Sequence, residues 1–213
     1  MSRTSTNSNA NRVPTPVKYF VSFTKEGDFS YWNKEVGERV SLGETIKFVL
    51  MDTRSAVGGW HEVDGVGARV FSNRVKSTVD EELVVRSGKE TLAKGLWADI
   101  KDKAKGAGGK FCTELFVLVE IDGKLEPVQM DFMGSALGDW MTFVEELGGK
   151  WAIYKSLVVA SKGEKRKKGS NVYYGINFTT EELSAESSDA ANAFNDDQLQ
   201  PYLNSGTAEP VTV

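Results

Sequence analysis

The chain has 213 residues, 40% of them hydrophobic and 26% charged, with a formal net charge of −4. That length suffices for one domain with a sizeable core, and no apolar run approaches the ~20 residues that a membrane helix needs. The first sixteen residues are polar and lack the apolar stretch of a secretory signal, so we expect a cytoplasmic protein. One cysteine and one histidine exclude an internal disulfide and a Cys/His zinc cluster, and no cofactor is predicted.

Charge is unevenly distributed along the chain. Residues 181–213 contain seven acidic residues and no lysine or arginine. The preceding residues contain 26 basic and 23 acidic residues, which leaves a net charge of +3. The sequence therefore combines a mildly basic body with an acidic tail. Such a tail either keeps the protein soluble or competes with an anionic ligand for the body.

Both ends of the chain are predicted to be disordered. Residues 1–16 are rich in Ser, Thr and Asn and contain almost nothing to bury, so they cannot offset the entropy of ordering. The acidic residues 181–213 have the same character, apart from isolated apolar residues. No internal repeat of about 20–50 residues is visible, so residues 17–180 are predicted to form a single domain.

Within this domain the apolar residues alternate with a period of two. Short runs rich in Val, Ile, Phe, Tyr and Trp are separated by Gly, Asp and Asn, which is the pattern of strands and turns. Asp122-Gly123 predicts a hairpin turn of type I′, and a second Asp-Gly pair lies within residues 60–69. The runs predicted as strands are residues 18–24, 29–33, 45–53, 67–73, 83–86, 90–100, 111–121, 124–130, 151–161 and 171–178.

One segment has helical spacing instead. Apolar residues recur every three or four positions across residues 135–147. Ser135 is the expected N-cap, Asp139 lies near the positive end of the helix dipole, and Gly148 supplies the stop. About ten strands and one amphipathic helix indicate an all-β fold, either a barrel or a sandwich, rather than an α/β enzyme fold.

No catalytic motif is complete. The run KGAGGK at 105–110 is similar to a phosphate-binding loop, but Ala104 replaces its first Gly, Phe111 replaces its Ser or Thr, and a β run follows. His61-Glu62 lacks the second His of a zinc protease, and no Gly-x-Ser-x-Gly is present. The carboxylates lie at positions typical of turns, loops and a helix surface. We therefore predict a protein without enzymatic activity, and a metal-dependent hydrolase is a distant alternative.

Basic residues cluster at two places. Lys101, Lys103 and Lys105 alternate, so an extended backbone would present all three on one side, and Lys110 follows a Gly-rich hinge. Residues 162–168 (KGEKRKK) form a second cluster between the last two predicted strands. Lysine and arginine side chains of this kind neutralise phosphates and release counterions. The alternative is that both clusters are solvent-exposed turns without a role in binding.

Aromatic residues with polar or glycine neighbours accompany these clusters. Aromatic rings stack on bases without reading their identity, so they suit a groove that tracks single-stranded nucleic acid. The other aromatics lie within apolar runs and are expected in the core. The candidates for stacking are Tyr31, Trp32, Trp60, Phe71, Trp97, Phe111, Tyr173 and Tyr174.

Several segments, in their order, resemble one family. They are Gly-Gly-Trp-His at 58–61, residues 69–74 (RVFSNR), 92–101 (LAKGLWADIK), 108–111 (GGKF) and the helix sequence 134–140 (GSALGDW). Over about residues 17–180 this succession is similar to the OB-fold single-stranded DNA-binding proteins of tailed bacteriophages. The resemblance implies an OB barrel, coating of replication or recombination intermediates, no catalysis, and an acidic C-terminal tail that regulates binding and recruits partners.

Two features depart from such proteins. Cellular bacterial single-strand binders end in an acidic stretch with an apolar Phe tip, whereas this chain ends in residues 209–213 (EPVTV). The predicted helix also falls late, after the Asp-Gly hairpin, rather than between the third and fourth barrel strands. The first departure puts partner recruitment through the tail in doubt, and the second indicates an elaborated barrel.

We therefore predict an OB-like Greek-key barrel with extra strands that binds single-stranded DNA without sequence preference and protects it during phage replication or recombination. The tail is expected to compete for the groove, so its deletion would tighten binding. Replication or recombination proteins are possible tail partners, self-association on DNA stays open, and no membrane is involved. The alternative is a structural or adaptor β-domain, such as a virion component. The predicted DNA-binding residues are Trp60, Arg69, Phe71, Arg74, Lys76, Trp97, Lys101, Lys103, Lys105, Lys110, Phe111, Lys165, Arg166, Lys167 and Lys168.

Overall fold

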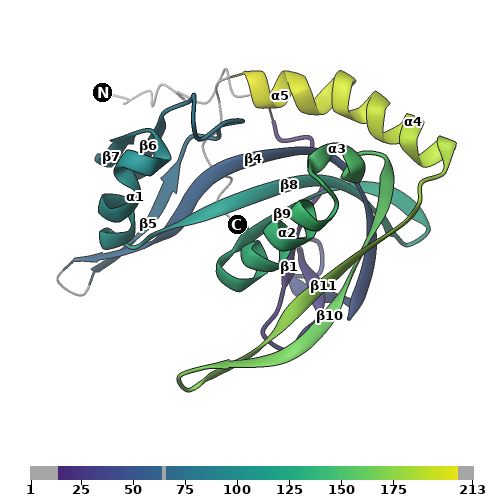
Figure 1. Cartoon of the computed structure of the whole chain (residues 1–213), viewed down its shortest axis with the longest axis horizontal. Coiled ribbons are helices and arrows are strands. Elements are labelled where there is room, and N and C mark those ends of the chain that lie inside the picture. The colour runs from purple at the N-terminus through teal and green to yellow at the C-terminus, as the bar shows by residue number, and fades with distance from the viewer. Residues whose placement is uncertain (1–13, 64–65, 206–213) are drawn as a thin grey trace, which may run out of the picture.

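The computed structural model describes residues 14–63 and 66–205 and shows a β-rich fold, as predicted (Figure 1). Its described strands all belong to one sheet. The strands are β1 (Tyr19–Phe23), β2 (Phe29–Asn33), β3 (Glu38–Gly43), β4 (Thr45–Val63), β5 (Val66–Ser72), β6 (Leu83–Ser87), β7 (Glu90–Gly95), β8 (Gly109–Ile121), β9 (Lys124–Met133), β10 (Ser156–Lys168) and β11 (Asn171–Glu182). The helices are α1 (Trp97–Gly106), α2 (Gly134–Glu146), α3 (Lys150–Ile153), α4 (Ala185–Phe194) and α5 (Gln200–Asn204), with a π-helical turn, Asn195–Leu199, joining the last two.

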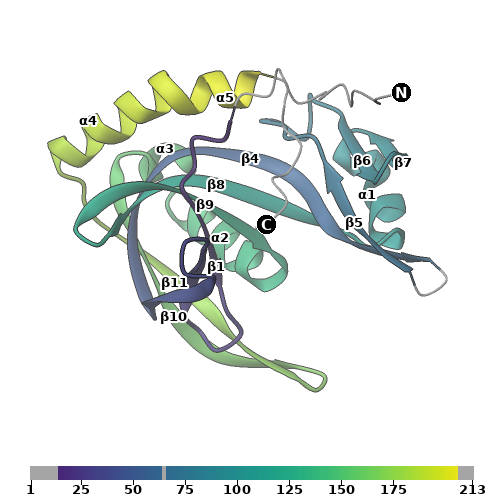
Figure 2. The ribbon, with the colours of Figure 1, turned by 180° about the vertical axis from the view of Figure 1, so that it is seen from behind.

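The long strand β4 divides the sheet into two arms. Its first residues, 45–49, pair with β10, and its last residues, 58–63, pair with β5. Strand β8 follows the opposite edge of β4 from Phe48 to Gly59. Beyond β8 the order continues through β9, β1, β2 and β3, with β1 parallel to β9. The β4–β5 and β10–β11 hairpins both project away from the α4–α5 helix, with α2 between them (Figures 1 and 2).

The inner face of the sheet carries the main core. Successive residues of a strand project to opposite faces of the sheet. Alternate residues of β8, such as Leu115 and Val117, therefore face inward together. Helix α2 covers this face with Trp140, which is fully buried, and Phe143. The predicted helix is thus confirmed, but it begins at Gly134 with Met133 in the N-cap position, so Ser135 is not its cap.

A second core lies between β4–β7 and helix α1. Ile100 and Ala104, four residues apart, pack with Val57, Val70 and Leu83. The prediction of a strand over residues 90–100 is therefore wrong from Trp97 onward, because the chain there forms a helix. The three lysines of residues 101–105 consequently do not share one side of an extended backbone. Successive helical residues are about 100° apart, which places the middle lysine well away from the other two.

A third core covers part of the outer face of the sheet. The helix formed by residues 185–204 buries Ala191, Leu199 and Tyr202 on strands β4 and β8, where Met51 and Phe116 lie. Its acidic residues Glu186, Asp189, Asp196 and Asp197 are exposed. The prediction of disorder from residue 181 is thus wrong over 181–205, since β11 runs to Glu182 and the Ser184 hydroxyl caps the helix that follows.

Turn chemistry agrees with the sequence where it is described. Asp122 and Gly123 both have positive φ, 53° and 73°, as a type I′ turn requires. Gly148, which has a φ of 75°, follows α2 and stops the helix. The second Asp-Gly pair, residues 64–65, and most of the predicted N-terminal arm, residues 1–13, lie outside the described residues.

Candidate nucleic-acid interface

Four of the predicted site residues share the outer face of one sheet region. Gly58 of β4 lies opposite both Phe71 of β5 and Lys110 of β8. Two residues along β4, and therefore on the same face, Trp60 lies opposite Arg69. Because opposite residues project to the same side, two rings and two cations face solvent together on this surface.

A groove begins at two of these residues and crosses the sheet, whereas Trp60 and Lys110 are not among the residues that line it. It is a hollow of about 300 Å³ that extends from Arg69 and Phe71 on β5 to Phe20 on β1. Gly58 contributes no side chain to the floor, and the neighbouring residue Cys112 is buried there, where loss of solvent raises the pKa of its thiol. Both cationic and acidic residues line the groove, and Asp131 is one of the acids.

Trp60 is the most exposed aromatic on this face. Its side chain lies across β5 against Gly67, where an added Cβ would be 2.0 Å from the indole nitrogen. Even so, the residue remains 60% exposed. Glycine at position 67 therefore lets the ring lie on the strand while a large part of it stays accessible to a ligand.

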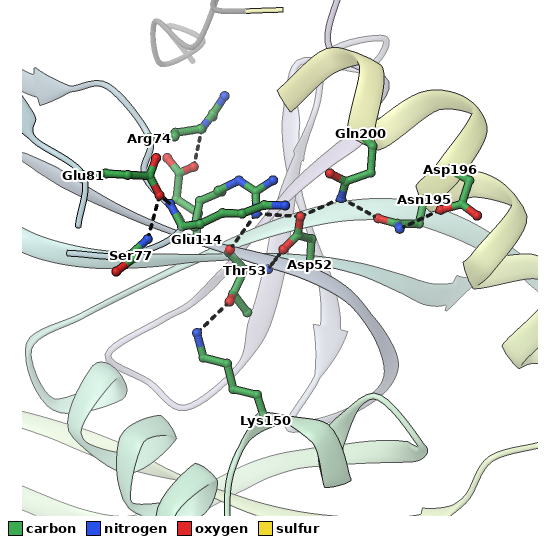
Figure 3. Close-up of polar contacts among 12 residues, drawn as sticks. Asp52, Thr53, Arg74, Ser77, Glu81, Glu114, Lys150, Asn195, Asp196 and Gln200 are labelled. Atoms are coloured by element: carbon green, nitrogen blue, oxygen red, sulfur yellow. Dashed lines mark hydrogen bonds and ion pairs between the residues drawn. The ribbon is translucent and has the colours of Figure 1, made fainter. Parts of the chain in front are cut away.

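Arg74 does not offer its charge to solvent, contrary to its predicted role. Its side chain is only 4% exposed and forms an ion pair with Glu114 (Figure 3). Its guanidinium also donates to the Tyr202 hydroxyl at 3.0 Å and to the Gln129 side-chain oxygen at 3.3 Å. Arg74 thus ties the sheet to the C-terminal helix. Burial raises the pKa of Glu114 to about 7, although the positive charge of Arg74 opposes the shift.

A second buried ion pair lies beside the first. Asp52 and Arg54 are 2.7 Å apart, and both side chains are almost fully buried. Asp52 also accepts a hydrogen bond of 2.7 Å from the side chain of Gln200 in the C-terminal helix (Figure 3). Sequence reasoning missed this polar network. The available signal was the charged pair Asp52 and Arg54 directly after the apolar run of residues 48–51.

Trp97 and Phe111 are used in packing instead. Their ring centroids are 5.0 Å apart, and Trp97 packs against the core beneath α1, on the other side of the sheet from the groove. The Gly-rich loop before Phe111 has a structural reason. An added Cβ would lie 1.9 Å from the Trp60 carbonyl oxygen at Gly108 and 2.8 Å from the Ala104 carbonyl oxygen at Gly109.

Most of the other lysines predicted to bind DNA are exposed, some after β5 and on α1 and the rest on the β10–β11 hairpin. Lys76 follows β5, and the lysines at 101, 103 and 105 lie on α1. Lys165, Lys167 and Lys168 lie near the tip of the β10–β11 hairpin.

Arg166 of the same hairpin is braced against α2. It forms an ion pair with Asp139 at 2.7 Å, and the second oxygen of that carboxylate accepts the backbone N–H of Ile176 at 2.9 Å. Gly175 leaves room for this arrangement, since an added Cβ would lie 2.6 Å from the Arg166 guanidinium carbon. Asp139 therefore anchors the hairpin.

The structure thus brings together Trp60, Arg69, Phe71 and Lys110, and it places the half-buried pair Trp97 and Phe111 on the other side of the sheet. In the part of the chain that the structure describes, no cluster of His, Cys, Asp and Glu could hold a metal ion. Nor is any helix of the described segments long and apolar enough to cross a membrane. No protein-family model, curated protein or solved structure matches the chain. The resemblance to phage single-strand binders therefore stays a prediction.

Proposed function

We propose that this protein binds single-stranded DNA without sequence preference, and that the outer-face groove is its binding site. The main support for this proposal is the solvent-facing surface on which Trp60 and Phe71 lie beside Arg69 and Lys110. Rings that stack on any base and cations that contact phosphates are the two components of such sites. Among the described residues of the groove, Glu114 is paired with Arg74 and the Cys112 thiol is buried, so we infer a role in binding rather than catalysis.

The strand topology supports an OB-type barrel. Strand β4 is antiparallel to β8 and β10, β8 pairs with β9, and β10 pairs with β11. If β4 is counted as the first barrel strand, α2 falls between the third and fourth strands, as in the family. The helix fell late in the sequence because β1–β3 precede the barrel and β5–β7 are inserted into it. Among the described strands β9 and β11 do not pair, and β1 lies beside β9 instead.

The predicted residues occupy the parts of such a barrel that bind ligands. OB folds bind oligonucleotides on the face of the second and third strands and on the loops between strands one and two and between strands four and five. Here Arg69, Phe71 and α1 belong to the first of these connections, and Lys110 begins the second strand. The lysines of residues 165–168 belong to the other connection.

The acidic C-terminal helix limits the groove at one end. It lies on the same outer face, contacts Arg74 through Tyr202, and carries four acids without a lysine or arginine. Deleting residues 181–213 would therefore expose core as well as remove charge. Replacing Asp196 and Asp197 with Asn tests electrostatic competition more cleanly, and binding should tighten most at low salt.

The main proposal is tested by titrating poly-dT while following tryptophan fluorescence. Trp60→Ala should weaken binding by about 5- to 150-fold, because base stacking contributes ~1–3 kcal/mol per base. The matched control is Trp151→Ala, since Trp151 is 81% exposed on α3 outside the groove. Absence of any binding by the wild-type protein at low salt would exclude the proposal.

A structural or adaptor domain remains the competing function, and one observation favours it. Trp97 and Phe111 are half-buried and contact each other, and Trp97 packs against the core beneath α1, as that alternative expects of the aromatics. Retention on single-stranded DNA cellulose separates the two functions. A protein that does not bind this matrix and forms large regular assemblies would be the structural or adaptor domain.

A further inference from the structure

A second hollow lies on the outer face next to the groove. It also measures about 300 Å³ and lies on strands β1 and β2. Phe20 lines both hollows, so they meet at one side chain. The residues that line the second hollow are Lys18, Tyr19, Phe20, Trp32, Asn33, Lys34 and Glu35.

The aromatic residues of the β1–β2 hairpin divide by face. On the inner face Tyr19 packs on Tyr31 and Phe23 on Phe29, with ring centroids 4.4 and 4.8 Å apart. Trp32 belongs to the outer face and is 46% exposed. No ring contact involves Trp32 within residues 14–63 and 66–205. The core therefore accounts for the inner rings of this hairpin and not for its tryptophan.

Positive charge accompanies this ring. Arg39 lies opposite Trp32 on β3, and its guanidinium donates to the hydroxyls of Ser22 and Ser30 at 2.9 and 3.0 Å. These neutral partners hold the guanidinium in place without cancelling its charge. Neither Arg39 nor Lys34 forms an ion pair with another described residue, and the acid that lines the hollow is Glu35. The surface thus combines a ring with unneutralised cations.

We propose that Trp32 is a second base-stacking site, reached by single-stranded DNA that leaves the groove past Phe20. A base stacks on the indole, and Lys34 and Arg39 contact the adjoining phosphates. The inference rests on the proposed function and makes the site longer. From β5 to β2 a strand of DNA crosses five inter-strand spacings of ~4.8 Å each, or roughly 24 Å.

Oligonucleotide length separates the second site from the first. Thymidine oligomers of about 3 and about 15 nucleotides lie below and near the top of the range of site sizes that OB folds occupy, and only the longer one can extend from Trp60 to Trp32. Trp32→Ala should weaken binding of the longer oligomer by about 5- to 150-fold and change that of the shorter by less than about twofold. Trp60→Ala should weaken both. Trp32→Phe should keep most of the affinity, and Trp151→Ala should affect neither oligomer.

The outcomes distinguish the two proposals. If Trp32→Ala binds the longer oligomer as tightly as the wild type while Trp60→Ala does not, the second site is wrong and the proposed function stands. If the wild type binds no oligomer at low salt, both are wrong. Equal urea midpoints for wild type and Trp32→Ala establish that folding is intact. Should that variant unfold, Lys34→Glu must show the same dependence on oligomer length for the second site to stand.

Discussion

The two halves of the outer sheet face differ in what covers them. Under the C-terminal helix the face carries Met51, Phe116 and Leu118, which are buried with Leu199 and Tyr202. On the β4–β5 arm the same face carries glycines, cations and exposed rings. The polar network of Asp52, Arg54, Arg74 and Glu114 marks the boundary between the two halves.

Composition alone does not separate a core aromatic from a binding aromatic. Phe116 on β8 and Phe71 on β5 lie on the same face of the sheet, on either side of β4, yet only the first lies under a helix. Four substitutions, ordered from the largest expected effect to the smallest, test whether the covered half determines stability and the open half determines DNA binding.

At the boundary, Arg74→Met should lower the free energy of unfolding by about 3–5 kcal/mol, because it leaves the Glu114 carboxylate buried without its partner. Urea denaturation measures the change. Lys94→Met is the matched control, since its pair with Glu82 is exposed, and it should cost at most about 1 kcal/mol. The double variant Arg74→Met/Glu114→Met should recover much of the loss. Failure to recover would mean that the ion pair is not the cause.

In the covered half, Leu199→Ala should cost about 2–5 kcal/mol, since Leu199 is fully buried on the side of the C-terminal helix that packs on the sheet and its truncation leaves a cavity. Leu125→Ala is the control, because Leu125 is 40% exposed in β9 and should change stability little. Equal effects of the two variants on the urea midpoint would contradict the assignment of the helix to the core.

Glu114 should make stability depend on pH. Its folded pKa of about 7 exceeds its ordinary value of 4.5, so the folded state binds a proton more tightly than the unfolded state does. The stabilisation is complete below about pH 4.5 and is lost as pH rises through about 7. Unfolding free energies between pH 5 and 8 should therefore decline less in Glu114→Gln than in wild type. Glu120→Gln, an exposed change on the same strand, should keep the wild-type decline.

In the open half, Lys110→Gln should affect binding without affecting stability. Loss of one phosphate contact should reduce the log–log salt slope for single-stranded DNA by about 0.7. Lys124→Gln is the control, because Lys124 is exposed at the start of β9, directly after the Asp-Gly turn and far from Lys110. An unchanged slope in Lys110→Gln would remove Lys110 from the interface.

Local sequence signals predicted the elements that local physics determines. Alternating apolar residues located the described strands except β3, Asp122-Gly123 located a turn that needs two positive φ angles, and helical spacing located α2. Residues 151–153, predicted as part of a strand, belong to helix α3 instead. The same rules failed at Trp97–Gly106, because its first residues continue an apolar strand pattern while Ile100 and Ala104 also satisfy helical spacing. Packing of that segment against β4–β7 decides between the two.

The sequence by itself therefore determined the β-rich class, the strands with their turns, and the separation of a basic body from an acidic end. Tertiary structure alone decided that residues 185–204 fold, because their few apolar side chains are sufficient only when strands β4 and β8 supply the other half of the core. It also decided that Arg74 is an internal anchor and Lys110 a surface cation. Burial is a property of neighbours distant in the chain, and no local pattern records them.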